Sequence, residues 1–310
     1  MIALCDDRCK AGRIAAQPAP EQRMERLGFI GIGLMGSRMT TRLLAAGYPV
    51  RLWNRSPEKC APLAALGAVP AASLAEMAEQ CDVLLLCLSD TAAVEAVVFG
   101  EDGLSDHLRQ GQLLVDFSSI TPDATRDFAD SLAARNIHWV DAPVSGGIGG
   151  AESGKLIVMA GGETEAVERL RPIAAHLSQR LTHMGPSGSG QITKICNQMI
   201  VASNAVLIAE TVALAAKAGV DAAQLAPALA GGFADSLPLQ ILAPRMATDS
   251  FEPVQWKVNT LLKDLDNAVA LAKEHQSGAP VSALASQLLR LHAGKGAGLE
   301  DLSSVVRLFK

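Results

Sequence analysis

The sequence predicts an α/β domain with a doubly wound, mostly parallel sheet, followed by an all-α domain, the two being joined by one long helix. Before residue 186, apolar segments of strand length alternate with helical segments, a pattern typical of parallel strands with crossover helices. After the breaker cluster at residues 185–190, the apolar residues keep a helical period almost to the end. A chain of 310 residues is long enough for two domains, which we expect at residues 24–186 and 187–310.

Each expected element follows from a local pattern of apolar residues and breakers. The strands of the first domain are expected at residues 27–32, 50–53, 83–88, 112–117, 138–142, 156–160 and 180–183. Its helices are expected at residues 37–46, 57–66, 73–79, 91–98, 122–135 and 163–176. Pro57 and Pro122 each follow a Ser or Thr, the combination typical of a helix N-cap and first turn. In the second domain the long helix is expected at residues 191–218, and shorter ones at 221–229, 239–246, 256–274, 281–292 and 299–308.

Composition argues against several classes of protein. With a net charge of −5 and no long basic run, the chain shows no sign of the positively charged surface that binds nucleic acid. The six cysteines and six histidines lack the spacings of a disulfide scaffold or a metal site. The longest apolar stretch, residues 83–88, has the length of a buried strand, so no membrane span is expected. We therefore expect a cytoplasmic protein without a metal, a nucleic-acid partner or a membrane partner.

Residues 1–23 differ from the rest of the chain in composition and in the pattern of apolar residues. They contain Pro18 and Pro20 and show no helical period. They lack the apolar core of a secretory signal, and the acidic pair Asp6 and Asp7 argues against a transit peptide. We expect a disordered extension or an over-long start, with Met24 directly before the first strand.

A glycine-rich turn joins the first expected strand to the first expected helix. Gly31, Gly33 and Gly36 form the pattern G-x-G-x-x-G, which gives a tight turn, a close approach of the backbone to phosphate, and close packing of helix on strand. The helix that follows would direct its amide-rich end at the anion. The sequence thus predicts a Rossmann-type dinucleotide site. Its expected cofactor loop comprises Gly31, Ile32, Gly33, Leu34, Met35 and Gly36.

The end of the second strand bears on the choice between NAD and NADP. An NAD-specific site would place an Asp or Glu there for the ribose 2′-hydroxyl. This chain has Asn54, Arg55 and Ser56 instead, and a guanidinium can fork onto a phosphate. The pattern favours NADP over NAD, although a polar strand exit without any ligand gives the same residues.

Polar residues also follow two other strands at the edge where ligands bind in this topology. Ser119 either touches the nicotinamide side or caps the helix that starts at Pro122. Ser145, Gly146 and Gly147 either present backbone amides to a carboxylate or form a flexible loop.

The start of the long helix carries a lysine and an asparagine three residues apart. At that spacing Lys194 and Asn197 share one helix face, just after the domain joint. The lysine either snorkels at the surface or lies in the cleft, where burial would lower its pKa toward the range of a general acid. Position alone leaves both interpretations open.

Taken together, these segments resemble the β-hydroxyacid dehydrogenase family, which includes 3-hydroxyisobutyrate dehydrogenase and tartronate semialdehyde reductase. The resemblance runs from about residue 26 to the end of the chain. Five motifs in the same order carry it, at residues 28–36, 54–56, 141–147, 190–197 and 263–265.

On the substrate side, the resemblance implies a division of roles. Lys194 would be the general acid/base, giving a proton to the aldehyde oxygen as hydride arrives and taking it back in oxidation. Asn197 would orient that oxygen. Ser145, Gly146 and Gly147 would hold the substrate carboxylate.

On the cofactor side, the resemblance places Leu88 and Ser119 along the nicotinamide, and Lys263 of the helical domain would close over the cofactor. Two positions depart from the family pattern. Ser89 stands where a proline is frequent, and Gln198 stands where some members have a second asparagine. Gln198 leans away from the 3-hydroxyisobutyrate branch.

The resemblance implies an NADP-preferring oxidoreductase that interconverts a small semialdehyde carboxylate and its 3-hydroxy acid, with tartronate semialdehyde (2-hydroxy-3-oxopropionate) and glycerate as the first pair to test. One alternative is a 3-hydroxyisobutyrate dehydrogenase that uses NAD. Others are an imine reductase, which usually replaces the lysine, and a non-catalytic NADP-binding interaction module. Because few charges lie along the long helix, we expect a homodimer or homotetramer.

Overall fold

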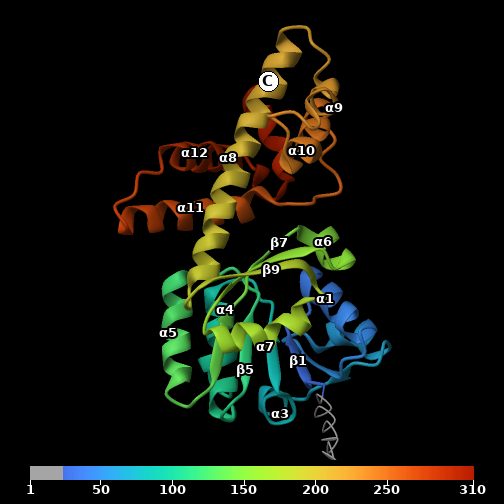
Figure 1. Ribbon diagram of the computed structural model, residues 1–310. Coiled ribbons are helices and arrows are strands. Elements are labelled where there is room, and N and C mark those ends of the chain that lie inside the picture. Colours follow the sequence, from blue (N-terminus) through green and yellow to red (C-terminus); the bar gives the residue numbers. More distant parts are fainter. Residues whose placement is uncertain (1–23) are drawn as a thin grey trace, which may run out of the picture.

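The computed structural model describes residues 24–310, and the prediction for residues 1–23 lies outside that range. Figure 1 shows an α/β part and a helical part stacked end to end, with α8 (Ser189–Lys217) running from the helical part down to the end of β9 (Ser178–Gly185). This arrangement confirms the predicted fold class.

A nine-stranded sheet forms the centre of the α/β part, in the order β3-β2-β1-β4-β5-β6-β8-β7, with β9 paired to β8. The neighbours from β3 to β6 are parallel, whereas β8 is antiparallel to β6 and β7. After β1, the chain adds β2 and β3 on one side of β1, and it then crosses over to add β4 on the other side of β1. That reversal marks the point where such sheets bind ligands. The remaining bounds are β1 Leu27–Ile30, β2 Val50–Trp53, β3 Val69–Pro70, β4 Val83–Leu86, β5 Leu113–Asp116, β6 His138–Asp141, β7 Val144–Ser145 and β8 Leu156–Gly161.

The central strands are apolar throughout because both faces of the sheet are covered. Alternate residues of β4 join different clusters, Leu85 packing with Met39 and Leu43 of α1, and Leu84 with Val94 of α4. Helices α1 and α7 therefore cover one face, and α3, α4 and α5 the other. Their bounds are α1 Leu34–Ala45, α3 Leu74–Gln80, α4 Thr91–Phe99, α5 Pro122–Ala133 and α7 Thr164–Ala174.

Several predicted elements differ in detail. The first helix begins at Leu34, inside the glycine motif, and not at residue 37. The segment predicted as one helix at 57–66 is a 3₁₀ turn, Pro57–Cys60, followed by the short α2, Ala61–Ala64. Thr121 caps α5 as expected, but Ser56 caps nothing with its side chain. Two-residue strands β3 and β7 and the helix α6, Gly147–Ser153, were not predicted.

In the helical part, α11 and α12 lie on one side of α8, and α9 and α10 on the other (Figure 1). The bounds are α9 Leu225–Leu229, α10 Leu237–Ala247, α11 Val258–Glu274 and α12 Pro280–Gly294. The segment predicted as a last helix is a 3₁₀ helix, Leu302–Leu308.

Helix α8 corrects one expectation. With a mean hydropathy of 1.9 over its most apolar window, it is long and apolar enough to cross a membrane by length and composition, although no such stretch was predicted. The small residues Ala205, Ala209 and Ala213 on one side of α8 are buried in the cluster that includes Leu242 and Leu261. In this structure one side of α8 therefore lies in the core of its domain.

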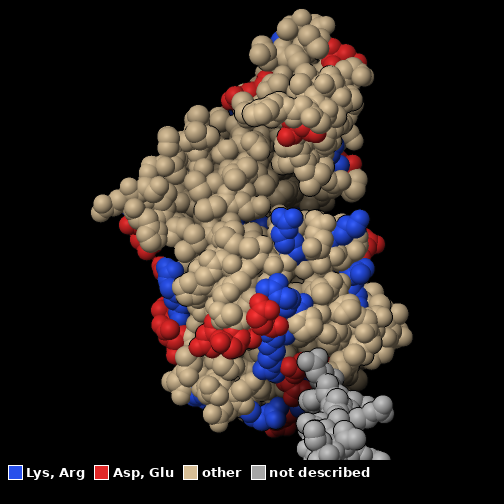
Figure 2. Space-filling model, viewed as in Figure 1, with Lys and Arg blue, Asp and Glu red and all other residues tan. Residues whose placement is uncertain are grey.

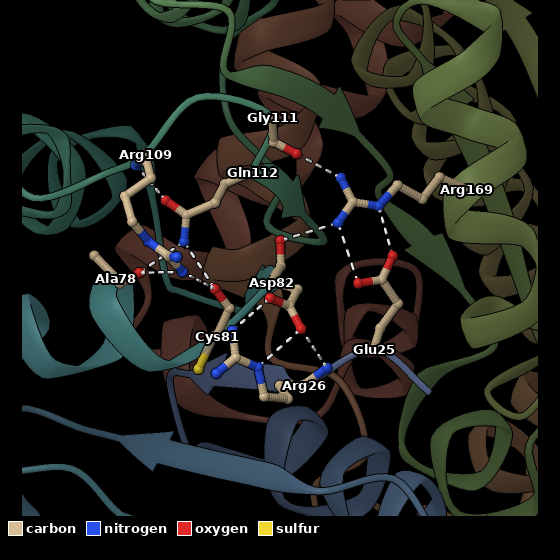
Figure 3. Close-up of polar contacts among 9 residues, drawn as sticks. All are labelled: Glu25, Arg26, Ala78, Cys81, Asp82, Arg109, Gly111, Gln112 and Arg169. Atoms are coloured by element: carbon tan, nitrogen blue, oxygen red, sulfur yellow. Dashed lines mark hydrogen bonds and ion pairs between the residues drawn. The ribbon is translucent and has the colours of Figure 1, made fainter. Parts of the chain in front are cut away.

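Ion pairs brace the sheet at the amino ends of its parallel strands (Figure 3). The Arg169 guanidinium of α7 contacts the Glu25 carboxylate with Nε–Oε1 and Nη2–Oε2 distances of 2.7 and 3.2 Å. It also donates to the carbonyl oxygen of Gly111, two residues before β5. Arg26 forms a second forked pair with Asp82, directly before β4. These ion pairs stabilise the edge of the sheet at which the parallel strands begin. The candidate site lies at the opposite edge, where the parallel strands end.

Candidate active site

The glycine motif at the end of β1 has the packing that its spacing predicts. Gly31 has a φ of +99°, and a Cβ there would collide with the carbonyl oxygen of Cys87. A Cβ at Gly36 would collide with the carbonyl oxygen of Gly31. At Gly33, by contrast, an added Cβ would meet no atom of the described residues within 4 Å. The turn therefore needs glycine for packing at two positions and leaves open space over the third.

That open space lies at the start of α1. The N-cap residue Gly33 is extended and has no side chain to cap the first turn, so it leaves the amides of Leu34 and Met35 without an N-cap side chain. A helix start of this kind attracts an anion through its amide groups and dipole. The residues present thus fit the diphosphate of a dinucleotide.

Asn54, at the end of β2, fixes the shape of this turn. Its Oδ1 accepts a hydrogen bond from the amide of Ile32 at 2.9 Å, and its Nδ2 donates to the carbonyl oxygen of Ser56 at 2.9 Å. Asn54 therefore ties the glycine loop to the chain that carries Arg55.

A cavity of about 500 Å³ adjoins the turn, and five predicted cofactor residues line it: Gly31, Asn54, Arg55, Ser56 and Leu88. Lys59 also lines it and is exposed, as Arg55 is. The sequence interpretation missed Lys59, although its position four residues after Arg55 in a turn was a usable signal. Two cations on one wall suit a phosphate ligand.

Ser118, the neighbour of the predicted Ser119, links the end of β5 to the segment after β4. The Ser118 Oγ accepts a hydrogen bond from the amide of Leu88 at 2.8 Å, and the Ser118 amide donates to Asp116 Oδ1 at 2.9 Å. Burial raises the pKa of Asp116 to about 7. Ser119 is half-buried, and the capping role considered for it is performed by Thr121.

Asp141 and Gln191 determine where α8 leaves the sheet. Asp141 Oδ1 and Oδ2 accept the amides of Gly188 and Gln191, each at 2.9 Å. The Gln191 side chain in turn donates to the carbonyl oxygen of Ser118 at 2.8 Å. These buried contacts fasten the first turn of α8 to the ends of β5 and β6, and so place Lys194 one turn further on.

Lys194 lies half-buried at the domain junction. Its Nζ donates to Gln198 Oε1 at 3.1 Å, and Asn197 Nδ2 donates to the same oxygen at 2.8 Å. Burial lowers the pKa of Lys194 to about 8; the Asp264 carboxylate opposes this shift and the Lys263 ammonium adds to it. The lysine is thus held at the base of the junction instead of snorkelling freely.

Two residues of α11 complete this cluster. Asp264 Oδ2 accepts from Gln198 Nε2 at 2.6 Å, and Lys263 Nζ lies 3.7 Å from Asp264 Oδ1. Across the junction, hydrogen bonds from the amide of Ala93 and from Ser89 lower the pKa of Asp90, and the charge of Lys263 contributes to the same shift. Lys263 therefore acts electrostatically on both domains.

The segment expected either to hold a carboxylate or to form a flexible loop consists of a short strand followed by a helix. Ser145 ends β7, which pairs with β8, and Gly147 begins α6. Gly146 and Gly147 are exposed. Within residues 24–310, no hydrogen bond joins this segment to Lys194 or Asn197.

Two family models match the chain. One, described as the NAD binding domain of 6-phosphogluconate dehydrogenase, matches residues 26–185. The other, described as NAD-binding of NADP-dependent 3-hydroxyisobutyrate dehydrogenase, matches residues 188–309.

Individual relatives agree with these matches over nearly the whole chain. The 2-hydroxy-3-oxopropionate reductase of Escherichia coli is 36% identical over 91% of this chain and 96% of its own. The 3-hydroxyisobutyrate dehydrogenase of Pseudomonas aeruginosa is 34% identical over 93% of this chain and 99% of its own. A solved structure of Psf3 in complex with NADP+ and 2-OPP is similar with a TM-score of 0.83, at 26% identity over 92% of this chain and 100% of that one. The chain therefore belongs to the β-hydroxyacid dehydrogenase family of NAD(P)-dependent oxidoreductases.

Proposed function

We propose that this enzyme prefers NADP and interconverts a small semialdehyde carboxylate and its 3-hydroxy acid, with 2-hydroxy-3-oxopropionate and glycerate as the first pair. The observation that carries the proposal is the placement of Lys194. Its ammonium is held at the domain junction with a pKa lowered to about 8, close to the range in which a general acid works at neutral pH. The similarity to 2-hydroxy-3-oxopropionate reductase supports the substrate pair.

In the proposed reduction, the nicotinamide supplies a hydride to the aldehyde carbon when NADPH is bound. Lys194 gives a proton from Nζ to the aldehyde oxygen, so that an alcohol forms without a free alkoxide. Asn197 lies next to Lys194 and donates a hydrogen bond to the same acceptor atom. Asn197 orients the aldehyde oxygen of the substrate. Ser145 and the amides of Gly146 and Gly147 hold the substrate carboxylate. In oxidation, neutral Lys194 takes the proton back.

The preference for NADP rests on the residues after β2. Arg55 and Lys59 are both exposed on the cavity wall, where an acidic residue would mark an NAD site, and Ser56 adds a hydroxyl donor. Glu101 and Asp102 also line the cavity, but they come from the segment after α4 and not from the end of β2. The NADP+ complex of the similar Psf3 structure supports the same assignment.

The decisive experiment follows oxidation of NADPH, and of NADH beside it, with tartronate, succinate and methylmalonate semialdehydes. We expect turnover with NADPH that is lost in Lys194→Ala, while that variant still binds NADPH. The absence of turnover with every semialdehyde, together with tight NADPH binding, would overturn the proposal and favour imine chemistry or a non-catalytic cofactor-binding module.

A 3-hydroxyisobutyrate dehydrogenase that uses NAD is the second candidate, because a relative of that name is nearly as similar. Faster turnover of methylmalonate semialdehyde with NADH would identify it. Gln198, in a position where some members have asparagine, argues for the first candidate.

We also propose a homodimer or homotetramer in the cytoplasm. Ile200, Leu207 and Leu214 are exposed on α8 at a spacing of seven residues, which places them on one side of the helix. Figure 2 shows few charged side chains over the adjoining face of the helical part. Light scattering of the purified protein should give at least twice the monomer mass, and Leu207→Asp should lower it.

A further inference from the structure

Gln198 occupies the centre of the polar cluster around Lys194. Only 3% of its surface is exposed, and each of its side-chain polar atoms has a partner. Oε1 accepts from Lys194 and Asn197, and Nε2 donates to Asp264 at 2.6 Å. One amide thus separates the half-buried ammonium from the buried carboxylate.

The Asp264 carboxylate fixes which way this amide faces. An ionised carboxylate can only accept hydrogen bonds, so the NH₂ group of Gln198 must point at Asp264. The carbonyl oxygen then points at Lys194 and Asn197, both of which donate. The opposite orientation would set the amide oxygen against a carboxylate and the NH₂ group against an ammonium. Asp264 therefore determines the acceptor that Lys194 meets.

We propose that Gln198 is a positioning residue for the reaction: its amide, oriented by Asp264, aims the Nζ of Lys194 and keeps the Asp264 carboxylate out of direct contact with that ammonium. This rests on the role of Lys194 in the proposed function. Gln198 itself transfers no proton.

The physical advantage lies in the neutrality of the amide. An acceptor is needed to hold the lysine tip, but a carboxylate in direct contact would stabilise the ammonium and raise its pKa. Among the residues that the structure describes, the charged groups that act on Lys194 are Asp264 and Lys263, both of α11. With the amide in between, the Asp264 charge acts from a greater distance, and burial keeps the lysine acidic enough to give up its proton.

A charge-exchange double variant, Gln198→Glu with Asp264→Asn, tests this arrangement. It keeps the total charge and allows the same hydrogen bonds, with the amide of the new residue at 264 donating to the new carboxylate at 198. Only the place of the negative charge changes. We expect the pKa of Lys194 to rise by at least about one pH unit, because an opposite charge in contact shifts a pKa by about 1–3 units. An unchanged pKa would overturn the proposal.

Two readouts keep this test separate from the proposed function. The first is the pKa of Lys194 from ¹³Cε chemical shifts of ¹³C-lysine-labelled protein, with the signal assigned by its loss in Lys194→Arg, which requires no substrate. The second is the alkaline limb of kcat for semialdehyde reduction. If no semialdehyde is turned over, the proposed function fails while the chemical shift still decides the positioning role.

Single variants cover the case in which the double variant does not fold. Gln198→Met removes the acceptor and keeps the volume, and we expect kcat to fall about tenfold or more with little change in the Kd of NADPH. Asp264→Asn removes a charge that stabilises the ammonium, so the pKa of Lys194 should fall below its wild-type value. The matched control is Gln112→Met, a buried glutamine directly before β5, which should lower the Tm without moving the pKa of Lys194. If Gln198→Met behaves like this control, with kcat unchanged, Gln198 has only a structural role.

Discussion

The Asp141 carboxylate accepts the backbone amide of Gln191 at 2.9 Å and so anchors α8 to the end of β6. Its other oxygen accepts the amide of Gly188, which means that both oxygens act as acceptors. Since Lys194 follows Gln191 by three residues on the same helix, this carboxylate sets the position of the proposed acid as well as the domain joint.

Asp141→Asn should therefore weaken both stability and catalysis. An asparagine at this position sets an NH₂ group against a backbone N–H, and losing a buried charged hydrogen bond costs about 1.5–3 kcal/mol. We expect the free energy of unfolding in urea to fall by that amount and kcat to fall with it. Asp127→Asn, an exposed position on α5, is the matched control and should change neither quantity. Wild-type stability in Asp141→Asn would contradict the anchoring role.

The second prediction concerns the pH dependence of stability at Asp116. Burial raises its folded-state pKa to about 7, and among the described residues its Oδ2 has no hydrogen-bond partner. The folded protein therefore binds a proton that the unfolded chain, with a pKa near its ordinary value, releases. This contribution to stability is present at low pH and is lost as the pH rises toward 7.

Asp116→Asn removes that titration, because the amide stays neutral. At pH 4 the variant and the wild type should have similar stability. By pH 8 the variant should be more stable by about 2–4 kcal/mol, since each pKa unit corresponds to about 1.4 kcal/mol. Urea unfolding at pH values from 4 to 8 measures the difference, and a constant difference across that range would contradict the buried, protonated Asp116.

The third prediction concerns Lys194 and the direction of the reaction. With a pKa of about 8, its ammonium is available for reduction below that pH, and its neutral amine for oxidation above it. The kcat of reduction should fall above pH 8, and that of oxidation should rise through it. Lys194→Ala should lose about 10²–10⁴-fold in kcat, the usual contribution of a general acid. Lys217→Ala, at the other end of α8, should leave both profiles unchanged.

Local patterns in the sequence predicted the large elements of this fold. The turn at Gly31 and the buried strands are determined by neighbouring residues, so their positions were correct to within a few residues. Strand β7 and helix α6 were missed for physical reasons. Val144 is held in a strand by pairing with Val158 of β8, and the glycine-rich start of α6 has low helix propensity, so its helical state depends on tertiary packing.

The candidate site shows the same limit. The spacing of Lys194 and Asn197 predicted a shared helix face, and both do contact one oxygen of Gln198. The partner of that glutamine, Asp264, lies 66 residues away on another helix, and no local pattern in the sequence could pair the two. Similarly, two adjacent serines follow β5, and only the fold shows that Ser118 contacts the amide of Leu88.

The last prediction concerns cofactor choice at Arg55. Its guanidinium lines the cavity beside Ser56 and is exposed, so replacing it should disturb the cofactor more than the fold. Arg55→Asp places a negative charge where the proposal puts the 2′-phosphate and an acceptor where NAD has a hydroxyl. We expect the KM for NADPH to rise at least about tenfold, equivalent to about 1.4 kcal/mol. The KM for NADH should stay constant or fall, so the preference moves toward NAD. Arg180→Asp, on the exposed strand β9, controls for the loss of a surface cation and should leave both KM values unchanged. Equal rises for the two cofactors in Arg55→Asp would argue against recognition of a 2′-phosphate at this position.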